Sequence, residues 1–234
     1  MVGTGNKISK FNIHKDVLCS ASPFFAAACK PEWMSADDRE IKLPDDDPET
    51  IQAMVYWIYY DRICILESID ERRFDYGTTT EAAMMTRWGL VAKLYVCGDK
   101  YQMPSLQNDA VDAMIDHAED TGEFRCPAII PWVYENTPSE ARIRGLLVLF
   151  VKCGYTCSEM TISKQYLCSE FLYDLSFSFF GTVDRVDSDG FGLFPDHCLR
   201  FHNHAGDGSA DSFRPCKVLK HLEYYDSQTD DWDA

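Results

Sequence analysis

The residues best suited to chemistry are cysteines and histidines late in the chain, which could together bind zinc. Thiolate sulfur and imidazole nitrogen are the usual ligands of a tetrahedral zinc site, and this part of the sequence supplies Cys153, Cys157, Cys198, His202, His204 and Cys216. Their spacing argues against a site, because 45 positions separate Cys153 from Cys198 and no two cysteines have the two-residue separation of a zinc knuckle. A zinc-stabilised regulatory protein is therefore the alternative hypothesis, and we expect no metal or cofactor.

Catalytic chemistry has less support. His14 has no nucleophile at a readable spacing, so we interpret it as a partly buried structural histidine with satisfied hydrogen bonds. Asp45, Asp46 and Asp47 precede a helix, where the macrodipole favours negative charge, and are interpreted as capping residues rather than an acid/base pair. Neither a Gly-x-Ser-x-Gly elbow nor a His-Glu-x-x-His motif occurs. The sequence indicates a protein that is not an enzyme.

Composition excludes further classes. The 234 residues carry a formal net charge of −16, and a nucleic-acid partner would require clustered basic residues instead. No apolar run is long enough to span a membrane, and the first residues contain no hydrophobic signal core. We expect an intracellular protein, cytoplasmic or nuclear, in which most of the ten cysteines are reduced and buried in the core.

The elements that would position these residues begin with two well-marked helices. Ser22-Pro23 and Asp47-Pro48 each place a good N-cap before a proline at the first helical position. After Asp47, apolar residues at helical spacing form one stripe that must be buried: Ile51, Met54, Val55, Ile58 and Tyr59. Short strands are expected at 7–13 and 40–43.

The middle of the chain predicts an antiparallel helix pair. A long helix capped by Thr80 is expected over 81–100, followed by a helix over 104–118 with Asp109 on its polar face. Further helices are expected at 128–134, 139–152 and 163–180. Residues 182–234 are rich in glycine and aspartate and are expected to form a largely disordered acidic tail.

Several separated motifs resemble the BTB/POZ domain in the version common in fungal proteins. They occur in the family's order and are Phe11-x-x-His14-Lys15-x-x-Leu18-x-x-x-Ser22-Pro23-x-Phe25, Ile41-x-Leu43-Pro44-x-Asp46-Asp47-Pro48-Glu49, Met54-x-x-Trp57-Ile58-Tyr59, and Leu94-Tyr95-Val96-x-x-Asp99-Lys100-Tyr101-x-x-Pro104-x-Leu106-x-x-x-Ala110. The resemblance implies an α+β fold over 8–120, a BTB/POZ-like cluster of helices with a small sheet. Residues 121–181 are similar to the helical C-terminal extension that follows this domain in many members.

The resemblance also predicts a structural gap. The family's first strand normally precedes the segment at 7–13, and here it is missing. Loss of that strand would leave a row of backbone donors and acceptors unpaired. A truncated, non-functional paralogue is a further alternative.

The same resemblance implies function through contact with other proteins. It predicts homotypic association through the surface of the BTB domain, as a homodimer or oligomer, and in members that recruit a cullin-type ubiquitin ligase it implies a substrate-adaptor role. Those members carry a hydrophobic residue followed two places later by glutamate. Trp33 occupies the hydrophobic position, whereas Ser35 replaces the acid. Trp33 and Met34 are therefore the candidate interaction residues.

Overall fold

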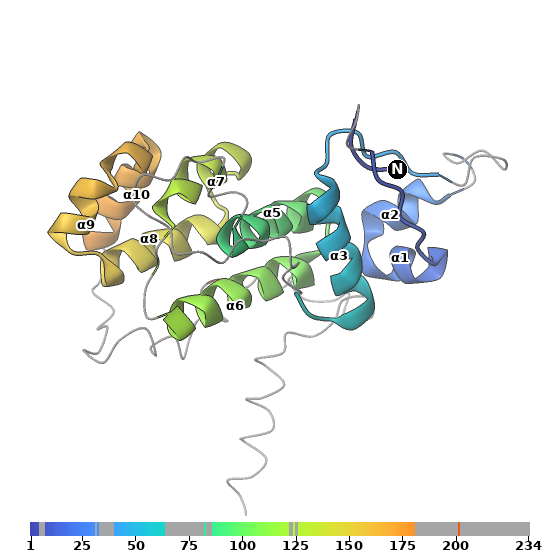
Figure 1. The fold of residues 1–234 in the computed structure, drawn as a ribbon, viewed down its shortest axis with the longest axis horizontal. Helices are drawn as coiled ribbons and strands as arrows, with labels where there is room; N and C mark the ends of the chain where they lie inside the picture. The colour runs from blue at the N-terminus through green and yellow to red at the C-terminus, as the bar shows by residue number, and fades with distance from the viewer. Residues whose placement is uncertain are drawn as a thin grey trace, which may run out of the picture.

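The computed structural model describes residues 1–4, 8–30, 32, 40–63, 82, 86–121, 124, 126–180 and 201. This part of the chain is mostly helical, and its elements are α1 (Lys15–Ala21), α2 (Pro23–Ala28), α3 (Pro48–Tyr60), α5 (Arg87–Lys100), α6 (Pro104–Thr121), η1 (Pro127–Ile129), α7 (Ile130–Asn136), α8 (Arg142–Gly154), α9 (Cys157–Ile162), η2 (Lys164–Tyr166) and α10 (Ser169–Phe180). Along the long axis, α1–α3 lie at one end, α5 and α6 in the middle, and α7–α10 at the other end (Figure 1).

The small sheet expected from the sequence is not found in the described residues. Val2 forms one isolated antiparallel bridge with Ser9 and one isolated parallel bridge with Leu43. Neither bridge is continued by a neighbouring pair, so the expected strands at 7–13 and 40–43 do not form a ladder. The α+β layout is therefore corrected to a mostly helical domain with two bridges.

The bridges nevertheless provide partners for part of the edge that was expected to be unpaired. The N–H of Gly3 donates to the carbonyl oxygen of Leu43 at 3.0 Å, and the N–H of Leu43 donates to the carbonyl oxygen of Met1 at 2.8 Å. Val2 and Ser9 exchange two hydrogen bonds of 2.9 and 3.0 Å. The first residues thus bind both segments around Ser9 and Leu43.

Both predicted helix starts are confirmed. The side chain of Ser22 accepts from the N–H of Phe25 at 3.2 Å, and that of Asp47 accepts from the N–H of Thr50 at 3.3 Å. The Ser22 hydroxyl also donates to the carbonyl oxygen of Tyr101 at 2.6 Å in a buried position. A local capping residue therefore also joins α2 to the turn after α5.

The buried face of α3 is shifted from the predicted stripe. Ile51, Met54 and Ile58 are buried as expected, but Tyr59 is exposed and Trp57 is buried. The Trp57 indole N–H donates to the Asp109 carboxylate of α6 at 2.6 Å. Because a buried indole requires an acceptor, this bond accounts for the inward position of Trp57 and for the half-buried position of Asp109, which was expected on a polar face.

The predicted antiparallel pair is α5 and α6, which pack very closely. A Cβ atom on Gly98 would lie 2.6 Å from Cγ of Gln107 and 3.1 Å from the backbone nitrogen of that residue. The predicted start of the first helix was wrong, because α5 begins at Arg87 and its cap is Thr86, whose hydroxyl accepts from the N–H of Gly89 at 3.2 Å. The predicted cap, Thr80, lies outside the described residues.

Two hydrophobic clusters share α5 and α6. One side of α5 contributes Leu90 and Leu94 to a cluster with α1–α3, while another contributes Trp88 and Val91 to a cluster with the extension. The ring of Phe201, within the segment expected to be a disordered tail, is buried in the second cluster. The rest of 182–234 lies outside the described residues, so its disorder stays a prediction.

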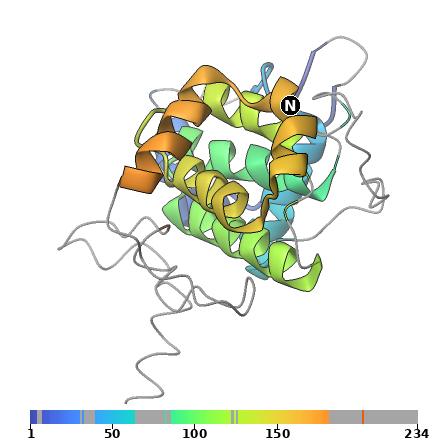
Figure 2. The same cartoon turned by 90° about the vertical axis from the view of Figure 1, so that its left-hand side faces the viewer.

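The predicted helix at 163–180 is replaced by two shorter elements, η2 and α10, and a separate short helix, α9, precedes them. Thr156 and Glu159 form a reciprocal capping box at the start of α9, η2 follows, and α10 begins only at Ser169. The capping box explains why a helix already begins at Cys157, because it satisfies two backbone N–H groups at the start of α9. Seen from this end of the molecule, α9 and α10 stand in front of α8 and α5 (Figure 2).

Candidate interaction surfaces

Trp33 and Met34, the predicted interaction residues, lie outside the described residues, as does Ser35. The structure describes the chain on either side, where α2 ends at a C-cap formed by Cys29 and the backbone resumes at residue 40. The contact role of Trp33 and Met34 therefore stays a prediction.

The zinc hypothesis gains no cluster from the described residues. Cys153 and Cys157 are exposed cysteines outside any disulfide, and Cys198, His202, His204 and Cys216 lie outside the part that the structure describes. Within that part, no group of three or more His, Cys, Asp or Glu side chains could hold a metal ion. Of the described cysteines, Cys29, Cys97 and Cys126 are buried, whereas others are half-buried or exposed, so core burial holds only for some.

His14 has hydrogen-bond partners, as predicted, but it is exposed rather than partly buried. Its Nδ1 lies 2.8 Å from the Tyr59 hydroxyl, and its backbone N–H donates to the same oxygen at 3.0 Å. Both bonds join the start of α1 to α3. The histidine therefore positions a helix, as expected of a structural residue.

The aspartates before α3 also act structurally. Asp47 accepts from the Thr50 hydroxyl at 2.7 Å and lies 3.4 Å from the Lys93 ammonium. Burial alone would raise the pKa of Asp47, but the bonds from Thr50 and the charge of Lys93 lower it below its ordinary value. Asp46 binds the Lys100 ammonium at 2.8 Å and the Tyr101 hydroxyl at 2.6 Å, so it joins the start of α3 to the end of α5.

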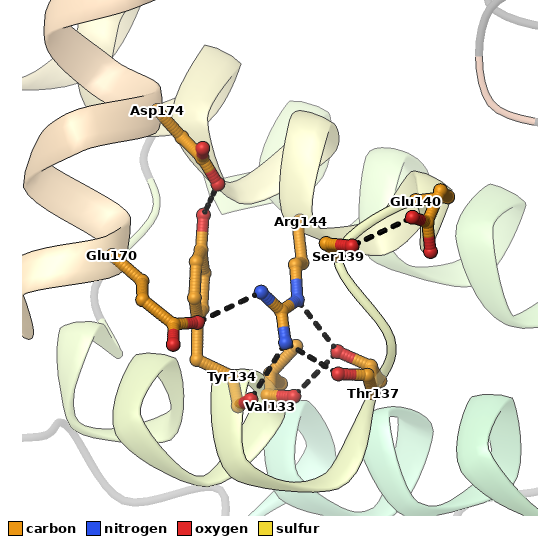
Figure 3. A network of polar contacts seen from close by, with 8 residues as sticks. All are labelled: Val133, Tyr134, Thr137, Ser139, Glu140, Arg144, Glu170 and Asp174. Atoms are coloured by element: carbon orange, nitrogen blue, oxygen red, sulfur yellow. Dashed lines mark hydrogen bonds and ion pairs between the residues drawn. The ribbon is translucent and has the colours of Figure 1, made fainter.

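The densest polar network surrounds Arg144 on α8 and joins the turn after α7 to α10 (Figure 3). Arg144 donates to the Thr137 hydroxyl at 3.0 Å and to the carbonyl oxygen of Tyr134 at 2.7 Å, and it also donates to the carbonyl oxygen of Thr137. Its guanidinium lies 4.4 Å from the centre of the Tyr134 ring and 3.0 Å from the Glu170 carboxylate of α10. One buried cation thus satisfies the end of α7 and attaches α10.

A second contact attaches the same helix. The Tyr134 hydroxyl donates to the Asp174 carboxylate at 2.8 Å, and burial followed by this bond raises the pKa of Tyr134. Figure 3 shows Glu170 and Asp174 both turned toward α7 and α8. Both acids of α10 are therefore engaged with this network.

The outward side of α10 is an aromatic surface, which we define as Leu172, Tyr173, Phe177 and Phe179. Tyr173 and Phe177 are 67% and 65% exposed, and their rings are stacked with 6.3 Å between centroids. The Lys152 ammonium borders this surface, 5.1 Å from the Phe179 ring centre, and donates to the carbonyl oxygen of Ser178 at 2.7 Å. Contiguous exposed aromatic side chains of this kind mark binding surfaces rather than ordinary solvated helix faces.

Exposed apolar side chains also occur at the opposite end of the molecule. Ile8, Phe24 and Tyr60 are exposed there, and the rings of Tyr56 and Tyr60 lie 4.4 Å apart between centroids, tilted by 31°. Sequence reasoning identified neither group, although the run FLYDLSFSFF in α10 contains more apolar residues than one buried stripe requires. That excess was the available signal.

Comparison with known proteins identifies the class. A family model described as the BTB/POZ domain matches residues 2–118, which is half of the chain. The chain belongs to the BTB/POZ domain family, whose domain is a protein-interaction domain and generally not an enzyme.

One relative adds detail. The Arabidopsis thaliana protein named BTB/POZ and MATH domain-containing protein 4 is 30% identical over 97 residues, which cover 42% of this chain and 20% of that protein. The chain thus spans about a fifth of the relative's length. Because the relative is from a plant, the narrower expectation of a fungal-type domain stays a prediction. No solved structure matches the chain significantly. Among the described residues, no helix is long and apolar enough to cross a bilayer.

Proposed function

We propose that this protein is an intracellular interaction module that associates with a second copy of itself and holds other proteins in the same assembly. The observation that carries self-association is the exposed aromatic surface of α10, which lies outside the residues 2–118 that the family model matches, while the family supports protein binding in general. BTB domains bind other proteins and each other, and Tyr and Phe side chains are enriched where proteins meet. The proposal includes the domain division into 8–120, 121–181 and 182–234.

Charge restricts where two copies can meet. Each copy carries a formal charge of −16, and like charges placed opposite one another oppose association. The four residues of the aromatic surface are uncharged, and the two acids of α10 are engaged elsewhere: Glu170 pairs with Arg144, and Asp174 accepts a hydrogen bond from Tyr134. Burial of exposed apolar area contributes about 25 cal/mol per Å². The second copy is therefore the occupant that we assign to this surface.

Light scattering on the purified chain tests the proposal. We expect a discrete dimer or small oligomer, and we expect Tyr173→Glu with Phe177→Glu to shift it toward monomer, because two carboxylates would then face two others. Tyr60→Glu is the matched control, since it also adds an acid at an exposed tyrosine but lies on α3.

Each outcome separates the surfaces. Loss of the oligomer only in the Tyr60 variant would assign association to the BTB domain instead of α10. A wild-type chain that remains monomeric or forms heterogeneous aggregates would overturn self-association and favour the non-functional paralogue.

The adaptor role is the finer part of the proposal. We infer that Trp33, with Met34 beside it, anchors a cullin-type scaffold, because an aromatic anchor supplies much of an interface's energy even where Ser35 replaces the family's acid. Trp33→Ala should weaken cullin binding about tenfold or more without changing the far-UV circular dichroism of the chain. Unchanged affinity in a titration calorimetry experiment would exclude this surface.

A further inference from the structure

Two helices near the N-terminus bring two cysteine residues to one backbone carbonyl group. Cys19 lies on α1, and Cys29 is the residue that ends α2. The Cys19 thiol lies 3.9 Å from the carbonyl oxygen of Phe25, and the backbone N–H of Cys29 donates to that same oxygen at 2.9 Å. Both cysteines are free, so each can react.

The surroundings give the two thiols different roles. Cys29 is 6% exposed, and burial followed by a hydrogen bond with Cys19 raises its pKa, while the charge of Lys15 acts in the opposite direction. Cys19 is only half-buried. A small oxidant therefore reaches Cys19 first, whereas Cys29 is sheltered beside it.

We propose that Cys19 and Cys29 form a reversible intramolecular disulfide when the protein meets a hydroperoxide. The Cys19 thiolate attacks the peroxide, the O–O bond breaks, and Cys19 becomes a sulfenic acid while hydroxide leaves. The Cys29 thiol then attacks that sulfur, the S–S bond forms, and the hydroxyl leaves as water with the proton of Cys29. Overall, two thiols and one hydrogen peroxide give one disulfide and two waters. Two equivalents of a small thiol such as glutathione then reduce the disulfide back to the two cysteine thiols and are themselves oxidised to glutathione disulfide.

The bond would join α1 to the end of α2. From this end the chain continues toward Trp33 and Met34. Oxidation would therefore fix the end of α2, which precedes the predicted interaction residues in the sequence. The disulfide itself does not depend on the proposed function, because it requires only that the two thiols meet in the folded chain.

The test is peptide mapping by mass spectrometry after treatment of the full folded chain with hydrogen peroxide and alkylation of the remaining thiols. We expect a peptide pair joined through Cys19 and Cys29. Neighbouring groups on one chain meet at an effective concentration near the millimolar range, so at micromolar protein this pair should exceed disulfides between chains by roughly a hundredfold. Glutathione should restore both free thiols.

Variants and internal controls make the result decisive. Cys29→Ser should leave Cys19 as a sulfenic acid that dimedone labels, and Cys29→Ala repeats the test if serine disturbs the buried position. Cys153 and Cys157 are the matched exposed pair, and Cys97 and Cys126 are the matched buried thiols. The proposal is overturned if Cys19 and Cys29 remain separately alkylated, if another pair dominates, or if the yield in the folded chain does not exceed that in denaturant.

Discussion

Arg144 shows how one side chain can organise a whole end of the molecule. Its guanidinium is buried and donates to three acceptors at the C-terminal end of α7, and it also forms an ion pair with Glu170. Burial of a charge is favourable only when its donors are satisfied and it is paired. The hydrogen bonds from Arg144 to α7 should therefore contribute more to stability than the ion pair between Arg144 and Glu170.

The first prediction concerns Arg144→Met, which keeps side-chain length but removes every donor. The carbonyl oxygens of Tyr134 and Thr137 would lose their partner, so the free energy of unfolding should fall by about 3 kcal/mol. Urea titration measures the change. Glu170→Gln is the control, and it should cost less than about 1 kcal/mol because the Glu170 side chain is 69% exposed. Equal effects of the two variants would contradict the assigned roles.

The second prediction concerns pH and Asp47. Because the folded pKa of Asp47 is lowered from the model-compound value of 3.8, its ionised form stabilises the fold above that value, and this contribution is lost as the pH falls through the lower folded pKa. Asp47→Asn keeps a good N-cap but removes the charge. The variant should be less stable than the wild type at pH 7, and the difference should disappear toward pH 2. Urea titrations at several pH values test this, and a constant difference would contradict it.

At the scale of elements, sequence reasoning succeeded where the cause is local. Ser22 and Asp47 cap helices because a side-chain oxygen lies three residues before the N–H group that it binds. It failed where partners are distant. The position of Trp57 depends on Asp109, 52 residues later. The side of α10 that faces solvent depends on the contacts of Arg144 with Glu170 and of Tyr134 with Asp174. Bridges between Val2 and Leu43 depend on segments that approach only in the folded chain.

The third prediction concerns the contact between α5 and α6. Gly98→Ala places a methyl group 3.1 Å from the backbone oxygen of Met103, which cannot move without shifting the turn. Overpacking of this kind should lower the free energy of unfolding by about 1 to 2 kcal/mol despite the better helix propensity of alanine.

Gly145→Ala is the matched control for that variant. Among the described residues, its new Cβ would meet only the Phe201 ring at 3.8 Å, an ordinary van der Waals distance. Alanine should therefore stabilise α8 by up to about 1 kcal/mol. Thermal unfolding of both variants distinguishes steric crowding from propensity, and a stabilising Gly98→Ala would show that the helices are free to separate.

At the scale of the whole molecule, the BTB domain and its extension share structural support. Leu94 and Leu106 pack toward α1–α3, while Trp88 and Val111 pack toward α7–α10. Both hydrophobic clusters contain side chains of α5 and α6. Unfolding of one cluster would therefore expose apolar area on two helices that the other cluster also needs. The boundary near residue 120 in the chain is therefore not a boundary in packing.

The fourth prediction follows from these two shared helices. Met54→Ala and Leu146→Ala each create a cavity at a fully buried position in a different cluster, so each should cost about 3 kcal/mol. Both should lower the midpoint of one common transition, in which far-UV circular dichroism and tryptophan fluorescence change together. If each variant instead shifted only one of two separate transitions, the clusters would unfold independently. Since Met54 and Leu146 belong to different clusters, the double variant should lose the sum of the two free energies of unfolding. One common transition together with this additivity is the result expected of a single cooperative unit.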